Sequence, residues 1–292
     1  MMERFEVRDF LKNVEKLPTL PGIAMRIIEM ANNPKSAADD LSRIIVSDQS
    51  LSAKVLRLVN SAYYGIRNRV SSVKQATVIL GFNTIKSLAL STAIMDKFAT
   101  TGVVEGFSRG EFWKHSLGVA ITNRILARKT GMRKDEEETF FMAGLLHDIG
   151  KVILDQYFHE EFVRVLQHLN TYGGSFHSAE KEVNGLTHAE IGGLLASQWQ
   201  LPEELIAAIR FHHAPQNRTE HVKYIAATHF ADILVKTKGF GSGGDQDLSG
   251  LDESVVGTLG ISEADVAVIV GVEMDREYQN ASEFLRLMEI ES

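Results

Sequence analysis

The apolar residues of this chain recur with the 3.6-residue period of an α-helix almost from end to end, and period-2 alternation is nearly absent. Proline, which interrupts helices, occurs only five times, at positions 18, 21, 34, 202 and 215. The pattern therefore predicts an all-α protein. With 292 residues, 44% of them hydrophobic and 24% charged, the chain is long enough to bury one large core or two modest ones.

Breaks in the pattern predict where individual helices begin and end. We expect a lead helix over residues 1–14, a Pro/Gly break at 17–22, a helix over 23–31, and helix starts at Ser36, Ser50 and Ser72. A further helix is expected to follow Leu80-Gly81 and to end near Phe98. Residues 101–110 are mostly small and have few core anchors. We place a boundary there, between an N-terminal helical half, 1–103, and a C-terminal helical half, 104–292.

Composition excludes several classes of protein. No apolar run approaches the ~20 residues that cross a bilayer, and the first residues lack the apolar core of a signal peptide, so we expect a cytoplasmic protein without membrane contact. The absence of cysteine excludes thiolate metal sites and fits a reducing compartment. A net charge of -7 argues against a large phosphate-binding surface, so DNA is not an expected partner.

The run AGLLHDIGKV, at residues 143–152, carries the most specific chemical signal. His147 and Asp148 follow two leucines where a buried helix is expected, and burying these two groups costs several kcal/mol unless they are paired or metal-bound. A functional site is the simpler interpretation. Lys151 lies four residues after His147 on the same helical face and suits an anionic substrate or a bridging hydroxide. A salt bridge with Asp148 explains this lysine equally well.

Other imidazoles and carboxylates lie in the same half of the chain. Glu111 and His115 are four residues apart in a helical context and project from one face, although such a pair is common on exposed helices. Thr187 and Glu190 form a capping box, which makes His188 the first residue of a helix. These positions add candidate ligands on two further helices.

The last candidates follow toward the C-terminus. His212 and His213 lie in the last turn of a predicted helix, where the helix dipole alone favours imidazoles. Asp232 lies among apolar residues and needs a partner, and His229 is either its neighbour or an ordinary core or surface histidine. Imidazoles and carboxylates together suit iron, manganese, zinc or another first-row divalent metal. The sequence thus offers one set of candidate ligands: Glu111, His115, His147, Asp148, His188, His212, His213 and Asp232.

The remaining histidines, at positions 159, 168, 177 and 221, are interpreted as ordinary surface residues. Residues 239–254, GFGSGGDQDLSGLDES, form the longest stretch of flexible composition. They partly match a calcium loop, with Asp245, Asp247 and Ser249 at alternate positions, but Val256 stands where a bidentate glutamate is needed. We expect a mobile surface loop rather than a calcium site.

Three N-terminal segments resemble the HDOD family, the HD-related output domains of bacterial signalling proteins. They are KLPTLPG (16–22), SDQSLSAKVLRLVNSAYYG (47–65) and SSVKQATVILGFNTIKSLAL (71–90), and the resemblance extends over about residues 10–235. It implies an all-α fold and a role in bacterial signal transduction or regulation. It also implies contacts with signalling protein partners and, usually, an eroded catalytic set.

The ligand set resembles that of the wider HD superfamily of metal-dependent phosphohydrolases, and its positions match the HD-GYP cyclic di-GMP phosphodiesterases. This resemblance implies a centre of two or three Fe, Mn, Ni or Zn ions on the candidate ligands, catalytic roles for Asp148 and Lys151, and a nucleotide or cyclic dinucleotide as substrate. The chain departs from those enzymes in two ways. The Gly-Tyr-Pro element is missing, and Ala214-Pro215 stands where they carry a glutamate after the paired histidines.

Two functions follow from these resemblances. In the first, the chain is a regulatory HDOD protein that retains a di- or trinuclear metal centre and acts through its two helical halves. In the second, it is a metal-dependent phosphohydrolase in which Lys151 steadies a phosphate oxygen. A third function, DNA binding by the helix-Gly-helix at residues 72–98, is disfavoured by the acidic balance.

Overall fold

The computed structural model describes residues 18–33, 36–98, 103–104, 106–248, 250–252, 254–281, 284 and 286. The predicted lead helix over residues 1–14 lies outside these ranges, as does Ser249 of the predicted calcium-like loop. The described part of the chain is built from α-helices with one short hairpin, which confirms the predicted all-α class.

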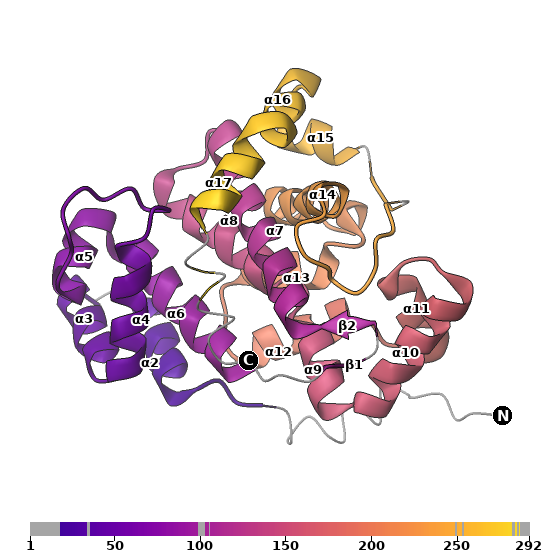
Figure 1. The fold of residues 1–292 in the computed structure, drawn as a ribbon, viewed down its shortest axis with the longest axis horizontal. Coiled ribbons are helices and arrows are strands. Elements are labelled where there is room, and N and C mark those ends of the chain that lie inside the picture. Colours follow the sequence, from indigo (N-terminus) through magenta and orange to yellow (C-terminus); the bar gives the residue numbers. More distant parts are fainter. Residues whose placement is uncertain are drawn as a thin grey trace.

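The N-terminal helices form one side of the molecule (Figure 1). They are α2 (Gly22–Ala31), α3 (Ala38–Val46), α4 (Gln49–Val59), α5 (Val73–Leu80) and α6 (Phe82–Phe98). Ser72 caps α5 as predicted, because its hydroxyl accepts the Gln75 N–H at 3.1 Å. The predicted start at Ser50 is wrong by two residues: Asp48 is the N-cap of α4, and its carboxylate accepts the Leu51 N–H at 3.0 Å. A carboxylate at the N-cap also interacts favourably with the positive end of the helix dipole.

The predicted connection over residues 101–110 holds a small antiparallel hairpin. Strand β1 (Val103–Val104) pairs with β2 (Phe107–Ser108), with Val104 opposite Phe107. Gly106 forms the turn with a φ of +90°, a conformation that side chains disfavour. Ser108 then begins the next helix by accepting the Glu111 N–H at 3.4 Å.

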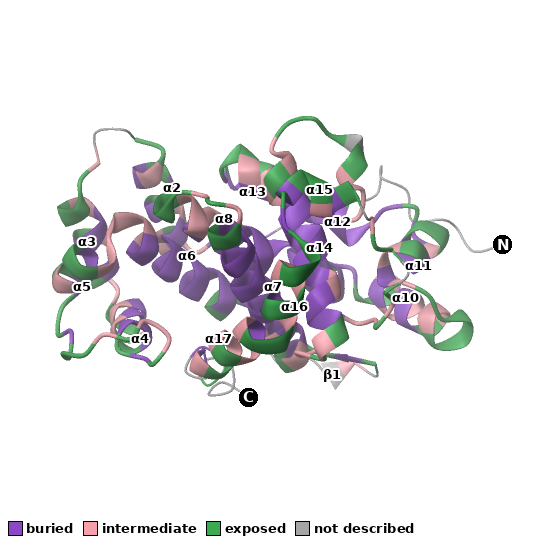
Figure 2. Ribbon diagram, turned by 90° about the horizontal axis from the view of Figure 1, so that it is seen from above, coloured by how far each residue is buried: buried purple, intermediate pink, exposed green. Residues whose placement is uncertain are grey.

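The C-terminal part carries the remaining helices. They are α7 (Arg109–Lys129), α8 (Lys134–Leu146), α9 (Ile149–Tyr157), α10 (His159–Tyr172), α11 (Phe176–Val183), α12 (His188–Gln198), α13 (Glu203–Phe211), the 3-10 turn η2 (Pro215–Asn217), α14 (Val222–Lys238), α15 (Ser254–Leu259), α16 (Glu263–Val268), the π-helix η3 (Ile269–Glu273) and α17 (Met274–Asn280). Helices α7 and α14 are buried over most of their length in the middle of the molecule (Figure 2). A helix that is buried around most of its surface provides positions at which polar side chains are shielded from water.

One hydrophobic cluster includes side chains from both sides of residue 103, so the N-terminal helices and the C-terminal helices share a core. Phe98, the last residue of α6, stacks on Trp199 after α12 with ring centroids 6.0 Å apart. The boundary at residue 103 itself stays a prediction.

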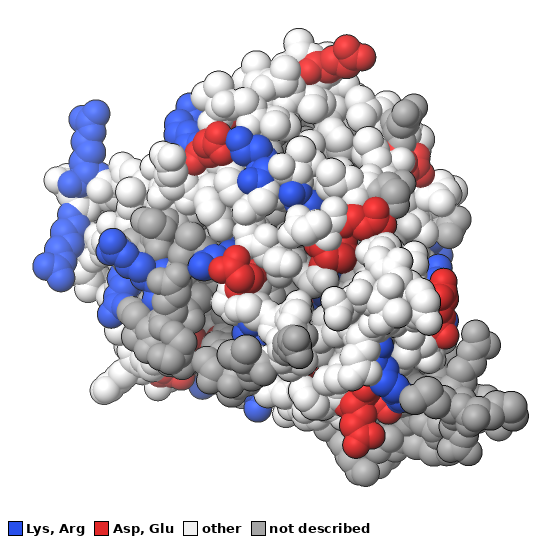
Figure 3. Space-filling view, turned by 45° about the vertical axis from the view of Figure 1, so that its right-hand side comes forward, with Lys and Arg blue, Asp and Glu red and all other residues white. Residues whose placement is uncertain are grey.

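On the face shown in Figure 3, Lys and Arg side chains gather mainly toward the N-terminal side, and acidic side chains are spread over the rest. None of the helices in the described ranges has the length and apolar character needed to cross a bilayer.

Candidate metal centre

The candidate centre is built around the elbow between α8 and α9. Helix α8 ends at Leu146, His147 is its C-cap, and Asp148 is the N-cap of α9, so the two residues project from a break rather than from the single helix that we expected. Two glycines bring other helices close to this elbow. A Cβ on Gly144 would lie 2.7 Å from the backbone of Ala120 in α7, and a Cβ on Gly150 would lie 2.0 Å from the His188 carbonyl oxygen in α12. Backbones can approach this closely only at glycine.

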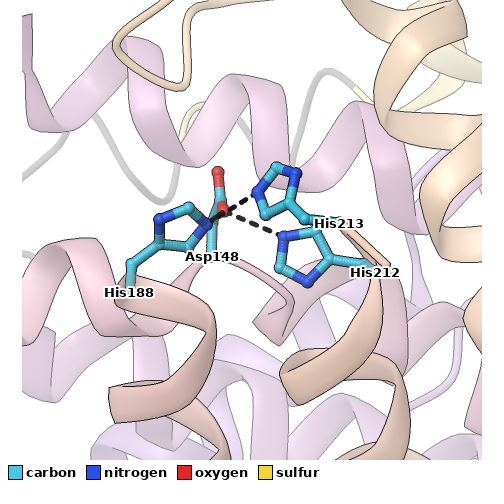
Figure 4. A group of neighbouring side chains, drawn as sticks. All are labelled: Asp148, His188, His212 and His213. Atoms are coloured by element: carbon cyan, nitrogen blue, oxygen red, sulfur yellow. Dashed lines mark hydrogen bonds and ion pairs between the residues drawn. The ribbon is translucent and has the colours of Figure 1, made fainter. Parts of the chain in front are cut away.

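A first group of ligand atoms meets at one oxygen of Asp148 (Figure 4). Asp148 Oδ1 lies 2.9 Å from His188 Nε2 and 3.6 Å from His212 Nε2. His213 Nε2 is 3.0 Å from His188 Nε2. His188 begins α12, as its capping box predicts, and His212 is the C-cap of α13. The four side chains therefore come from three different helix ends, all facing one point.

A second group lies on the other side of Asp148 and consists of His115, His147 and Asp148 itself. His147 Nε2 is 3.4 Å from Asp148 Oδ2. Asp232, in the middle of α14, joins this group, with its Oδ1 at 2.9 Å from His115 Nε2 and 3.9 Å from His147 Nε2. Asp148 belongs to both groups, an arrangement that suits two adjacent ions sharing one carboxylate.

Several buried atoms that face this space lack a partner with hydrogen-bond geometry within the described part of the chain: His115 Nε2, His147 Nε2, His212 Nε2, Asp148 Oδ1 and Asp232 Oδ1. Two of them still lie at ion-pair distance from a histidine, since Asp232 Oδ1 is 2.9 Å from His115 Nε2 and Asp148 Oδ1 is 2.9 Å from His188 Nε2. The second ring nitrogen of His147 lies 2.7 Å from the Gly144 carbonyl oxygen, and that of His212 lies 2.8 Å from the Ile209 carbonyl oxygen. Because a carbonyl oxygen only accepts, each Nδ1 carries a proton, and in the neutral form of each ring the Nε2 lone pair faces the cluster. Buried polar atoms without partners are rare, and divalent metal ions would satisfy this set.

The charge states also fit metal ligands. Burial lowers the pKa of His115, lowers that of His212 to about 4, and lowers that of His213 well below its usual range, so these rings are neutral at neutral pH. Burial by itself would raise the pKa of Asp148, but His147, Lys151 and His188 together hold it well below its usual range. Neutral imidazoles and an ionised carboxylate are the forms that bind metals.

His188 differs from the other histidines of the cluster. Burial lowers its pKa, but the carboxylates of Glu180 and Asp148 outweigh burial and raise the pKa to about 9. His188 Nε2 lies 2.9 Å from Asp148 Oδ1 and 3.0 Å from His213 Nε2, so a proton on this nitrogen faces both partners. A metal ion bound at this point would take the place of that proton.

The HDOD domain family matches residues 17–215 of this chain. The chain belongs to the HDOD family. A crystal structure of an HDOD domain protein of unknown function from Geobacter sulfurreducens is 28% identical, with a TM-score of 0.73 over 97% of this chain and 94% of that chain. Asp232 lies beyond the family match, on the helix that completes the second group of ligands.

Two curated relatives of the HDOD chain are longer proteins. An uncharacterised protein of Treponema pallidum is 26% identical over 224 residues, which are 76% of this chain and 43% of that protein. Ribonuclease Y of Thermus thermophilus is 34% identical over 122 residues, which are 41% of this chain and 16% of that protein. The HDOD chain thus spans less than half of the length of either relative.

Glu111 is in neither of the two groups of converging ligand atoms. Its side chain is 47% exposed and pairs with Lys114 Nζ at 2.9 Å. His229 is accounted for without a metal, because its Nδ1 donates to the His212 carbonyl oxygen at 2.6 Å and its Nε2 accepts the Asp252 N–H at 3.1 Å. His177, interpreted from sequence as a surface residue, is half-buried and stacks on His213 at 4.5 Å.

Sequence reasoning missed Glu180, a fully buried carboxylate on α11. Its Oε2 accepts from His188 Nδ1 at 2.6 Å and from the His188 backbone N–H at 2.9 Å. Carboxylates that hold the far nitrogen of a metal-binding histidine fix the orientation of the ring. The available signal was its position four residues after Phe176, on the apolar face of the same helix.

Replacing Glu180 by glutamine is expected to lower the metal affinity about 10- to 100-fold, the usual effect of losing a carboxylate that orients a ligand. The amide keeps the volume of the side chain, so the fold should be retained. Titration with Mn²⁺ or Zn²⁺, followed by calorimetry, measures the change. The exposed Glu182 on the same helix pairs with His168 at 3.2 Å, and Glu182→Gln serves as the matched control. Equal affinities for the two variants would contradict the assigned role.

Proposed function

We propose that this chain is an HDOD signalling protein whose C-terminal half binds two or three divalent metal ions and hydrolyses a phosphate ester. The observation that carries the proposal is the set of buried ligand atoms that converge in two groups sharing Asp148. The likeness to Ribonuclease Y over part of the chain supports a phosphodiester as the substrate class. A nucleotide or cyclic dinucleotide is the substrate that we favour.

The proposed ligands divide between two positions. Asp148, His188, His212 and His213 would hold one ion, and Asp148, His115, His147 and Asp232 would hold a second. Fe, Mn, Ni and Zn all suit this mixture of imidazole and carboxylate. Ions bound there would supply an activated water and neutralise charge on the phosphoryl oxygens.

The other charged residues set the electrostatics of the reaction. Lys151 Nζ lies 2.7 Å from Asp148 Oδ2 and, as an ammonium, attracts a phosphate oxygen at the same point. Lys236 Nζ lies 3.2 Å from Asp232 Oδ2 and keeps that carboxylate ionised. Hydrolysis forms one P–O bond to the water oxygen and breaks one ester P–O bond, and the ester oxygen leaves with a proton that originates from the water.

The test is hydrolysis by the purified chain loaded with Mn²⁺ or Fe²⁺. Cyclic dinucleotides, nucleotides and bis(p-nitrophenyl) phosphate are offered as substrates, and release of the product is followed by chromatography or absorbance. We expect Lys151→Gln to lower kcat by about 100-fold or more, as for other groups that stabilise developing charge, while the metal content stays the same. Full activity in this variant would remove Lys151 from the reaction.

A regulatory role without turnover is the second candidate, and the burial of Lys151 favours it. This side chain is only 1% exposed, so a substrate cannot contact it in this conformation of the protein. The missing Gly-Tyr-Pro element points the same way. A chain that binds metal stoichiometrically but hydrolyses none of the substrates would support this second function, in which signalling protein partners read the state of the metal centre.

A further inference from the structure

A glycine-rich segment lies directly over the proposed metal centre. We call residues 241–245, between α14 and α15, the strap; the loop that contains it is visible in Figure 1. The Ser242 N–H donates to the Glu111 carbonyl oxygen at 3.0 Å, which places the strap on the first turn of α7. We expected a surface loop here, but Gly243 is buried and specific contacts join the strap to α7.

The strap fits this position because it consists largely of glycine. A Cβ on Gly241, whose φ is +71°, would lie 2.4 Å from the Glu111 carbonyl oxygen. A Cβ on Gly243 would lie 3.2 Å from Asp148 Oδ2 and 3.3 Å from His115 Nε2. The backbone of the strap thus closes the side of the centre where Asp148 and His115 meet.

The strap also occupies Lys151. The ammonium donates to Asp148 Oδ2 at 2.7 Å and to the Gly243 carbonyl oxygen at 2.8 Å, and it lies 4.9 Å from the centroid of the Phe176 ring. The ammonium has three N–H groups, but the side chain is only 1% exposed, so a phosphate oxygen reaches it only when a neighbouring group moves away. Of its neighbours Asp148, Phe176 and Gly243, only Gly243 lies on the strap, so the phosphate oxygen would compete with the Gly243 carbonyl oxygen for a place beside the ammonium.

Asp245 anchors the far end of the strap. Its Oδ1 lies 3.0 Å from Lys236 Nζ, and its Oδ2 accepts the Phe176 N–H at 2.9 Å. The side chain is 4% exposed. Because Lys236 also contacts Asp232, the anchor of the strap and a proposed metal ligand share one ammonium group.

We propose that the strap is an internal competitor of the substrate: the Gly243 carbonyl oxygen takes the position on Lys151 that a phosphate oxygen takes, and Asp245 is the positioning residue that holds the strap closed. This inference rests on the proposed function of the centre. It implies that a phosphate group and the closed strap exclude each other. The substrate has to displace the strap before its phosphate reaches Lys151.

The test uses hydrogen exchange of the strap amides in the metal-loaded protein, measured by mass spectrometry. We expect Asp245→Ala to raise exchange in residues 241–245 by about tenfold or more, the factor by which one charged hydrogen bond favours a closed state. The same variant should lose its metal to a chelator faster than the native chain does. Asp252→Ala is the matched control, because the Asp252 carboxylate is in the same loop but accepts from Ser254.

A second arm uses inorganic phosphate as the probe. Phosphate at millimolar concentration should raise strap exchange in the native chain, and it should have no effect in Lys151→Gln. If Asp245→Ala leaves exchange unchanged, or if phosphate slows exchange or has no effect in the native chain, the proposal is wrong. If phosphate opens the strap but the protein hydrolyses no ester, this inference stands and the proposed activity falls. If the protein hydrolyses an ester but phosphate leaves strap exchange unchanged, the proposed activity stands and this inference falls.

Discussion

Replacing Asp148 by alanine is expected to remove most of the bound metal. Asp148 is the one residue shared by the two groups of converging ligand atoms, with Oδ1 facing His188 and His212 and Oδ2 facing His147. Its loss therefore weakens both proposed ion positions at once. We expect the affinity for metal to fall by at least about 100-fold. Losing a residue that only orients a ligand lowers metal affinity by up to about 100-fold, and losing a ligand should cost no less. Elemental analysis after gel filtration measures the ions per chain.

Glu111→Gln is the matched control for this prediction, since Glu111 was predicted from sequence as a ligand but lies outside both groups of converging atoms and pairs with Lys114. This variant should keep the metal content of the native chain. Circular dichroism on all three proteins checks that the helices are retained. Unchanged metal content in Asp148→Ala would refute the proposed centre, and loss of metal in Glu111→Gln would return that residue to the ligand set.

Replacing Arg124 by alanine is expected to cause a large loss of stability. This buried guanidinium on α7 donates to Glu138 Oε2 at 2.7 Å and to the Tyr63 hydroxyl at 2.8 Å. Glu138 also accepts from Thr84 of α6 at 3.3 Å, so the network joins the N-terminal helices to α7 and α8. Removing one partner leaves the Glu138 carboxylate buried without its cation, at a cost of about 3–5 kcal/mol. The melting temperature should fall by roughly 10 °C.

Arg128→Ala provides the comparison, because Arg128 lies one turn further along α7 and its side chain is 49% exposed. Its pair with Glu137 at 2.8 Å should contribute at most about 1 kcal/mol. Calorimetry or urea unfolding of the two variants gives the difference. Equal melting temperatures would mean that the buried network does not stabilise the contact between the two parts of the chain.

Local signals predicted the helices well. The capping box of Thr187 and Glu190 placed His188 at the start of α12, and Ser72 placed the start of α5, because capping hydrogen bonds join residues three apart in the chain. The error at Ser50 has the same local origin. Asp48 and Ser50 both carry side chains that cap helices, and periodicity alone does not choose between them.

The site was predictable where burial makes a polar residue improbable. His147, Asp148 and Asp232 stand among apolar neighbours, and their convergence accounts for that burial. Glu111 lacked this signal, since a pair of residues four apart shows only that they share a face and not whether the face points inward. Its side chain turned out to be half-exposed.

Neither the position of the strap nor the contact of Glu180 with His188 could be predicted from a local sequence pattern, because both depend on how separate elements of the fold pack together. Glycine-rich composition is typical of a mobile loop, yet the same lack of side chains lets residues 241–245 lie against Glu111, His115 and Asp148. Glu180 reaches His188 only because α11 and α12 meet at a tight connection.

The sequence by itself determined the helical class, most helix ends and the chemistry of the candidate ligands, because hydrophobic periodicity, capping and residue type act over a few neighbouring positions. Only the tertiary structure decided which ligands meet, that Asp148 is shared between two groups, and that a glycine backbone covers them. Those outcomes depend on how closely whole helices approach one another, and that distance is set by packing between residues far apart in the chain.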